Sequence, residues 1–383
     1  MRVAHFEVSA SCCVILLLLA CAVTPCQVTS AWQVEIVDNS RGKNAGAFSS
    51  LAIDRFGNLH LVYSRSGGNA LQYAFCTKTD KRWDKAVIDP TGGSYGTIAV
   101  DSKGRAHIAY NSFKVVGLHY AEWDGTQWQK AIIDPVHTTR ETSIQLDSQD
   151  NPRITYFRER YADGRTAQSL KYAYFDGKTW FLQTVDHRYG SGGWNALALD
   201  RQDRPNISYS TASGFLGFTS LVQRSPAGSS WDHGSVDFQS AKGRRFLDTD
   251  SSLAIGSDDL PYVAFINAAD RTINYAWKEG DSWHRETVDT LVATGGDSDQ
   301  VSLKLDKRGN AHLAYSDSGL GKLKYAVRDK SGWHTETVDD SNAGLYASLC
   351  LGADGDPYIS YYATSSWELR IAHRESSEPS PAK

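Results

Sequence analysis

The sequence predicts an all-β fold: a seven-bladed β-propeller with four-stranded antiparallel blades, closed by the N-terminal strand. The first observation is a repeat, because the pattern Trp-x4-[Val/Ile]-Asp occurs seven times in 383 residues, at intervals of 45 to 52 residues. A period of this size is typical of solenoids and propellers. The second is composition: 19 Tyr and 11 Trp against 1 Met suit the pleated surface of strands. The repeated tryptophans are Trp32, Trp83, Trp128, Trp180, Trp231, Trp283 and Trp333.

Each repeat contains four strand-like segments, which is the third observation. A short apolar run such as 51–54 is followed by a polar turn with glycine and by an alternating run such as 60–63. The third run, such as 170–173, leads through an Asp-Gly turn into the segment that begins at the repeated Trp. Short alternating runs and Asp-Gly turns indicate antiparallel β-meanders. Four such strands, repeated around an axis, form the blades of a propeller.

The ring is expected to close through the N-terminus. The last repeat, 349–372, supplies only three segments, whereas the first Trp segment, 32–38, has no partner before it. We therefore expect 32–38 to complete the last blade, which removes exposed sheet edges. The chain then divides into a signal peptide at 1–31, one propeller domain at 32–375 and a disordered tail at 376–383.

The leader predicts export. The apolar run 12–23 follows Arg2 and is shorter than the ~20 residues needed to span a bilayer. Two processing sites compete: Leu-Leu-Ala-Cys at 18–21 resembles a bacterial lipoprotein box that would lipidate Cys21, and the small residues at 29–31 suit ordinary signal cleavage. We expect a protein that is periplasmic, lipid-anchored at the cell surface or secreted, and that contacts a membrane only through such a lipid.

Composition and charge exclude several classes of protein. The chain is 41% hydrophobic and 22% charged with a formal net charge of -4, which excludes a disordered chain and a nucleic-acid binder that works by bulk positive charge. We expect a monomer without cofactors that binds a glycan, a polysaccharide or another exported protein. Cys76 and Cys350 lie in different repeats and are expected to be buried free thiols.

Most of the repeated residues are expected to be structural. The Trp residues should pack between neighbouring blades, and the repeated Asp residues should accept hydrogen bonds at strand ends. His60, His107 and His312 share one column of the repeat and suggest a metal site. A metal site needs converging ligands, whereas these stand one per repeat, so we expect no metal.

One turn carries a family resemblance. The Asp-Gly-x-x-Trp segments at 124–128 and 176–180 resemble a shortened Asp-box, the motif that marks the third-to-fourth strand turn of sialidase-like (BNR) propellers. The repeat, over 32–375, resembles exported bacterial seven-bladed propellers of that group. Compared with the Asp-box, these segments lack one residue between Asp and Gly, and the segment 229–231 contains no Asp-Gly. Sialidases have six blades and an Arg-Ile-Pro motif, and this chain shows neither. The resemblance implies the propeller and no particular activity.

The variable connections predict where a ligand binds. Turns between first and second and between third and fourth strands are short, whereas the other two classes of connection vary and are longest in repeats 3 to 6. Because function commonly lies on such loops, we predict a site on their face, centred on blades 3 to 5. Gln145 and Lys304 interrupt a column of small residues in the innermost strands and should make the channel locally polar. The candidate ligand contacts are Arg158, Arg160, Tyr161, Arg165, His187, Arg188, Tyr189, Trp194, Arg244, Arg245 and Asp248.

This set of side chains predicts that the ligand is an anionic glycan. Arginine binds carboxylate and sulfate groups in a bidentate manner, and Tyr and Trp offer flat faces to sugar rings. The first function that fits is a glycan-binding module, which needs no catalytic group. A propeller that binds another exported protein as a scaffold is a second.

An enzyme acting on an acidic polysaccharide is the third. A polysaccharide lyase would use His187 and Tyr189 as base and acid, with Arg188 and Arg244 neutralising the uronate carboxylate. A glycoside hydrolase would need two carboxylates at a suitable separation. The candidates for these carboxylates are Glu159, Asp248 and Asp250.

Overall fold

The computed structural model describes residues 31–374 apart from eleven short gaps. The proposed signal peptide with Cys21 and the proposed C-terminal tail lie outside the described residues. Within them no helix is long and apolar enough to cross a membrane. The gaps are 40–44, 66–69, 113, 136–137, 163–164, 189–190, 214–215, 225–229, 241–249, 268 and 293–299.

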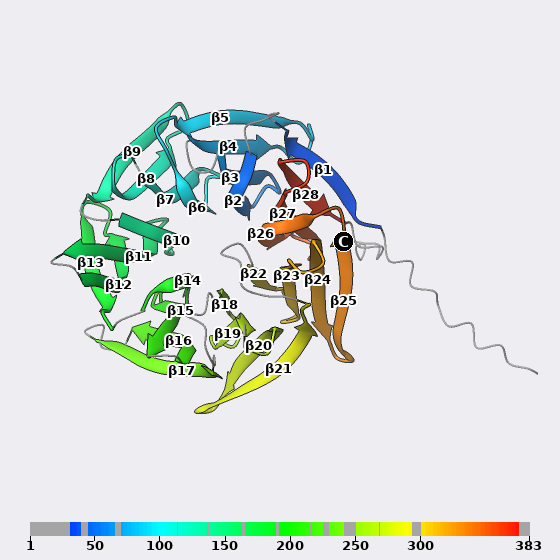
Figure 1. The fold of residues 1–383 in the computed structure, drawn as a ribbon. Helices are drawn as coiled ribbons and strands as arrows, with labels where there is room; N and C mark the ends of the chain where they lie inside the picture. Colours follow the sequence, from blue (N-terminus) through cyan, green and yellow to red (C-terminus); the bar gives the residue numbers. More distant parts are fainter. Residues whose placement is uncertain are drawn as a thin grey trace, which may run out of the picture.

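The chain forms seven four-stranded antiparallel sheets arranged as blades around a central axis (Figure 1). Blade 1 contains β2 (Ala45–Ile53), β3 (Leu59–Arg65), β4 (Ala70–Cys76) and β5 (Trp83–Asp89). Blade 2 contains β6 (Ser94–Val100), β7 (Ala106–Ser112), β8 (Gly117–Trp123) and β9 (Trp128–Asp134). Blade 3 contains β10 (Thr138–Leu146), β11 (Pro152–Ala162), β12 (Arg165–Phe175) and β13 (Trp180–Asp186). Blades 4 and 5 contain β14 (Gly193–Leu199), β15 (Pro205–Ser213), β16 (Leu216–Arg224) and β17 (Trp231–Ser240); β18 (Ser251–Ile255), β19 (Pro261–Asn267), β20 (Thr272–Glu279) and β21 (Ser282–Thr290). Blades 6 and 7 contain β22 (Val301–Leu305), β23 (Ala311–Asp317), β24 (Lys322–Asp329) and β25 (Gly332–Asp339); β26 (Ala343–Leu351), β27 (Pro357–Ala363), β28 (Glu368–His373) and β1 (Gln33–Asp38).

The N-terminal strand closes the ring, as the sequence predicts. Strand β1 pairs antiparallel with β28, with Gln33 opposite His373 and Val34 opposite Ala372. Figure 1 shows β1 in blue beside β28 in red, so the two ends of the propeller domain share one blade. The predicted fold class is therefore confirmed.

The repeated tryptophans pack between blades, as expected. Each stands at the start of the outermost strand of its blade, and five of them contact a tyrosine on the third strand of the preceding blade. Trp128 meets Tyr73 edge to face with ring centroids 5.0 Å apart, and Trp180 meets Tyr120 at 5.2 Å. Such T-shaped pairs are the preferred geometry of aromatic rings. The same contact occurs in the pairs Trp32–Tyr325, Trp231–Tyr172 and Trp333–Tyr275.

The repeated aspartates accept hydrogen bonds, and their donors are tyrosines of the next blade. Tyr63 on β3 donates its hydroxyl to Asp38 at the end of β1, at 2.8 Å, and both side chains are buried. Neither group would be tolerated inside the protein alone, because a buried hydroxyl or carboxylate without a partner is costly. Six of the seven blade interfaces contain this Tyr–Asp hydrogen bond, and in blade 5 the tyrosine is replaced by Phe265. The other pairs are Tyr110–Asp89, Tyr156–Asp134, Tyr209–Asp186, Tyr315–Asp289 and Tyr361–Asp339.

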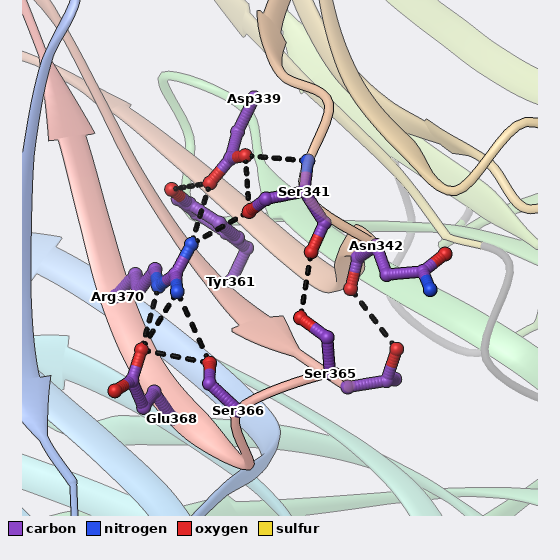
Figure 2. Close-up of polar contacts among 9 residues, drawn as sticks. Asp339, Ser341, Asn342, Tyr361, Ser365, Ser366, Glu368 and Arg370 are labelled. Atoms are coloured by element: carbon purple, nitrogen blue, oxygen red, sulfur yellow. Dashed lines mark hydrogen bonds and ion pairs between the residues drawn. The ribbon is translucent and has the colours of Figure 1, made fainter.

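Figure 2 shows one of these bonds at the interface of blades 6 and 7. Asp339 accepts the Tyr361 hydroxyl at 2.6 Å, and Arg370 donates to the same carboxylate oxygen at 3.1 Å. The second oxygen of Asp339 accepts the backbone N–H of Ser341 at 2.9 Å, which directs the connection into blade 7. The aspartate thus joins two blades and also fixes the start of the following connection.

The three histidines of the shared column are likewise hydrogen-bonded within their own blades. The Nδ1 atoms of His60 and His107 lie 2.7 Å and 2.5 Å from the hydroxyls of Tyr73 and Tyr120. His312 makes the same contact. Among the described residues, no three His, Cys, Asp or Glu side chains gather as metal ligands would. Cys76 and Cys350 are free and buried, in blades 1 and 7.

We predict that Tyr63→Phe lowers the free energy of unfolding by roughly 1.5–3 kcal/mol, because it leaves the buried carboxylate of Asp38 without one donor. Chemical denaturation measures this change. Tyr174→Phe is the matched control, because the structure gives the half-buried Tyr174 no hydroxyl hydrogen bond among the described residues. An equal loss in both variants would show that the Tyr–Asp bond adds nothing specific.

Candidate functional site

A cavity of about 160 Å³ opens at the mouth of the central channel. It lies on the face that carries the fourth-to-first and second-to-third connections, the face predicted from the sequence. Its lining comes from the first residues of the innermost strands and so from every blade. We call it the channel mouth, and it contains Phe48, Tyr95, Glu141, Trp194, Asp250, Gln300 and the hydroxyl residues that follow them.

Five residues at the channel mouth have a left-handed backbone. They occupy the same position in blades 1, 2, 3, 4 and 7, and each lies inside a β-bulge or register shift between the first and second strands of its blade. Bulges commonly redirect a side chain, and non-glycine residues with positive φ are uncommon outside functional sites. The five are Phe48 (φ 54°), Tyr95 (φ 49°), Glu141 (φ 47°), Trp194 (φ 49°) and Tyr346 (φ 56°).

The next blade holds this conformation in place. The carbonyl oxygen of Tyr346 accepts the hydroxyl of Ser49 at 2.9 Å, and that of Tyr95 accepts the hydroxyl of Thr142 at 2.6 Å. The carbonyl of Glu141 accepts the side-chain amide of Asn195 at 2.6 Å. The strain at each residue, of order 1–3 kcal/mol, therefore persists because an inter-blade hydrogen bond compensates it.

Three of these residues form an aromatic wall on one side of the channel mouth. The ring of Phe48 lies 4.3 Å from that of Tyr95 and 4.6 Å from that of Tyr346, measured between centroids. All three side chains are half-buried. Phe48 and Tyr95 line the cavity, and Tyr346 from blade 7 packs against the ring of Phe48.

The other blades supply acidic and polar groups. The Glu141 carboxylate accepts the backbone N–H of Trp194 at 3.0 Å, and the Asp250 carboxylate accepts that of Val301 at 2.7 Å. Trp194 itself is only 8% exposed. The mouth thus joins an aromatic wall to two carboxylates whose positions are fixed by neighbouring blades.

A belt of hydroxyls below these residues ties successive blades together. Each hydroxyl accepts a backbone N–H from the innermost strand of the next blade. The bonds run from Leu51 to Ser348, Ile98 to Ser50, Leu197 to Ser143, Leu303 to Ser252 and Leu349 to Ser302, at 3.0–3.4 Å. The floor of the mouth is therefore rigid, which is what a preformed binding site requires.

Two of the predicted arginines stand beside the aspartates of the Tyr–Asp bonds. Arg158 lies 3.7 Å from Asp134, and Arg188 binds Asp186 through Nε and Nη2, with Nη2 at 2.5 Å. Burial alone would raise the pKa of Asp186, but hydrogen bonds from Arg188 and Tyr209 hold this pKa at about 2. These arginines already neutralise a structural carboxylate.

The other predicted contacts are placed only in part. His187 and Arg160 are exposed on the predicted face, while Trp194 lines the channel mouth. Glu159, one of the hydrolase candidates, is contacted by Arg140 at 3.7 Å and is not part of the mouth, whereas Asp250 is. Tyr189, Arg244, Arg245, Asp248 and the side chains of Tyr161 and Arg165 lie outside the described residues.

Sequence reasoning did not single out Phe48, Tyr95, Glu141 and Tyr346. Alignment of the repeats contains a signal for them, because each stands two residues before the hydroxyl or small residue that opens an apolar run. Three of these four residues are aromatic. The left-handed backbone conformation that brings these residues together cannot be predicted from the sequence of a single repeat.

We predict that Arg188→Ala raises the pKa of Asp186 from about 2 towards its usual value of 3.8, because the compensating guanidinium is lost. A titration of the aspartate carboxyl signals by NMR measures this change. Because the folded-state pKa of Asp186 lies below its unfolded value, the ionised carboxylate stabilises the fold at neutral pH, and in the wild type this contribution should be lost only as the pH falls from about 4 towards 2. An Asp186 pKa that stays near 2 in the variant would assign the shift to Tyr209 and the backbone N–H of residue 188.

The comparisons with known proteins establish the fold. No protein-family model and no curated protein matches the chain. A protein of unknown function from Dyadobacter fermentans has a TM-score of 0.54 at 9% identity, covering 90% of this chain and 98% of that one. A PL25 ulvan lyase has a TM-score of 0.51 at 13% identity, covering 75% of this chain and 80% of that one. The fucose-specific lectin from Aleuria aurantia has a TM-score of 0.50 at 15% identity, covering 76% of this chain and 95% of that one. At such identities the likeness shows a shared propeller architecture and nothing finer.

Proposed function

We propose that this protein binds a glycan at the channel mouth. The observation that carries the proposal is that the rings of Phe48 and Tyr95 line one cavity together with Glu141 and Asp250. Tyr346 supports this aromatic wall by packing on Phe48. A sugar ring has an apolar C–H face and a rim of hydroxyls. The C–H face packs on aromatic rings through dispersion and burial, and the hydroxyls donate to carboxylates and exchange hydrogen bonds with amides.

Acidic groups of the glycan bind the arginines around the mouth. Arg188 is 60% exposed and uses Nε and Nη2 on Asp186, so its Nη1 makes no hydrogen bond among the described residues. A carboxylate or sulfate would share the guanidinium with Asp186. Arg158 and the predicted Arg244 and Arg245 would extend this positive rim. Because Arg158 and Arg188 are already paired with aspartates, we expect acidic groups to add affinity to a site defined by the aromatic wall.

Two structural neighbours support a carbohydrate ligand. One is a fucose-specific lectin, and the other is an ulvan lyase solved with -[GlcA(1-4)Rha3S]- bound. They show that this architecture serves both carbohydrate binding and carbohydrate cleavage. The channel mouth of this chain supplies its own reason to place a sugar there, independent of either neighbour.

Catalysis on an acidic polysaccharide is the second candidate function. Its specific support is that Glu141 and Asp250, from blades 3 and 5, both line the mouth, as a hydrolase with two carboxylates requires. Incubation with acidic polysaccharides separates the possibilities: new reducing ends with Glu141→Gln inactive indicate a hydrolase, absorbance from unsaturated uronates indicates a lyase, and intact polymer leaves a binding module.

We predict that Tyr95→Asn weakens binding of a glycan selected on an array by about tenfold or more, because it removes one aromatic ring that lines the cavity. Asparagine is chosen because it tolerates the left-handed backbone. The control is Trp367→Asn, since Trp367 has φ 61°, is 50% exposed and lies on the same face of blade 7, outside the cavity. Equal losses in both variants, or no glycan retained by the wild type, would reject the channel mouth as the site.

We also predict that replacing Arg188 and Arg244 together by Ala weakens binding of acidic glycans by about tenfold or more, and that high salt reproduces this loss. Binding of neutral glycans should change little. The control replaces Arg55 and Arg308, which are exposed on first-to-second turns of the opposite face. If neutral and acidic glycans weaken equally, the arginines hold the loops and do not recognise charge.

A further inference from the structure

A second cavity, of about 410 Å³, lies between blades 2 and 3 on the face opposite the channel mouth. Its lining comes from the first-to-second turns and from the ends of the third and fourth strands. Phe175 and Trp180 form its aromatic side, with ring centroids 5.4 Å apart. Glu122, Lys103 and Asn151 border the cavity with an acceptor, a cation and an amide.

Comparison with other blade interfaces explains why this space is open. Between blades 5 and 6 the same position is filled by Glu286, which accepts Trp333 Nε1 at 2.9 Å and pairs with Arg328 across the interface. Between blades 6 and 7 Glu336 and Arg374 pair in the same way. Strand register places Ala131 where Glu286 stands, and Phe175 where Arg328 stands.

The polar groups of the cavity are held in a fixed arrangement. The Tyr120 hydroxyl donates to Glu122 at 2.9 Å and lies 2.5 Å from His107 Nδ1, which orients the carboxylate toward the cavity rim. Ser102 bonds both oxygens of Asp150, at 3.0 Å and 2.6 Å, and so joins the two turns that border the cavity. Glu122 remains 40% exposed, so it can accept a hydrogen bond from a ligand.

We propose that this inter-blade cavity binds one sugar unit, independently of the channel mouth. The C–H face of the sugar packs on Phe175 and Trp180, while its hydroxyls donate to Glu122 and accept from Lys103 and Asn151. A hydroxylated ring satisfies this lining because its groups both donate and accept. The protein then carries carbohydrate sites on both faces, and this one lies where Ala131 and Phe175 stand in place of the Glu–Arg pair of the interfaces of blades 5 and 6 and of blades 6 and 7.

The test uses the whole propeller labelled with 5-fluorotryptophan, in which the Trp180 resonance is identified by its loss in Trp180→Phe. The probes are methyl glycosides of glucose, galactose, mannose, fucose and glucuronic acid at millimolar concentrations. We expect at least one probe to shift the Trp180 resonance in a saturable way. Ala131→Glu should weaken this binding at least tenfold, because it introduces the carboxylate that fills this position between blades 5 and 6 and between blades 6 and 7, and that Trp180 Nε1 can bond.

Three controls keep the outcome interpretable. Ala86→Glu makes the same change between blades 1 and 2 and should leave the shift intact, and both glutamate variants should unfold at the temperature of the wild type. Tyr95→Asn should also leave the Trp180 shift intact, since the channel mouth lies on the other face. The proposal is overturned if no glycoside shifts Trp180, if Ala131→Glu retains the shift, or if sodium sulfate produces the same shift, which would show a site for any anion.

Discussion

The buried hydrogen bond between a tyrosine of one blade and an aspartate of the preceding blade is the constraint on which the ring depends. The aspartate ends the outermost strand and the tyrosine stands in the second strand of the next blade, as in Asp134 and Tyr156 at 2.8 Å. Both are buried, and each is tolerated there only because the other is present. The bond therefore fixes how far each blade rotates from its neighbour, and six such bonds, together with the pairing of β1 with β28, give a closed ring. Where the tyrosine is Phe265, other hydrogen bonds join the two blades, such as that between the hydroxyls of Ser208 and Ser251 at 3.0 Å.

The same aspartates also shape the functional face. Because each one ends a fourth strand, it sits where the connection to the next blade begins, and cations gather around it: Arg158 at Asp134, Arg188 at Asp186, and Arg370 at Asp339. An arginine near this face is thus partly neutralised before any ligand arrives. An acidic glycan would compete with a structural carboxylate for it, so recognition has to begin with the aromatic wall at the channel mouth. The loops determine what else the ligand touches.

Sequence reasoning predicted the fold well because its signals are local and repeated. The spacing of Trp and Asp gives the blade count, and the unpaired Trp32 segment gives the closure. The face of the site and the position of Trp194 follow from strand direction. The contribution of Phe48, Tyr95 and Tyr346 does not, because their left-handed backbone depends on partners in other blades, such as Ser49 for Tyr346. The sequence likewise shows a cluster of charged residues but not that Arg188 pairs with Asp186, because this pairing depends on the geometry of the fold.

Binding sites in a repeat protein arise where the repeat is interrupted. A regular interface satisfies its own groups, as Glu286, Arg328 and Trp333 do between blades 5 and 6, and then nothing remains for a ligand. Replacement of that pair by Ala131 and Phe175 opens a cavity without loosening the Trp180–Tyr120 contact beside it. At the channel mouth, aromatic residues occupy the left-handed position in neighbouring blades 7, 1 and 2 but acidic groups occupy the corresponding position in blades 3 and 5, so one asymmetric site replaces seven equal ones. Because such departures are particular to this chain, a shared propeller architecture alone does not transfer a ligand from one protein to another.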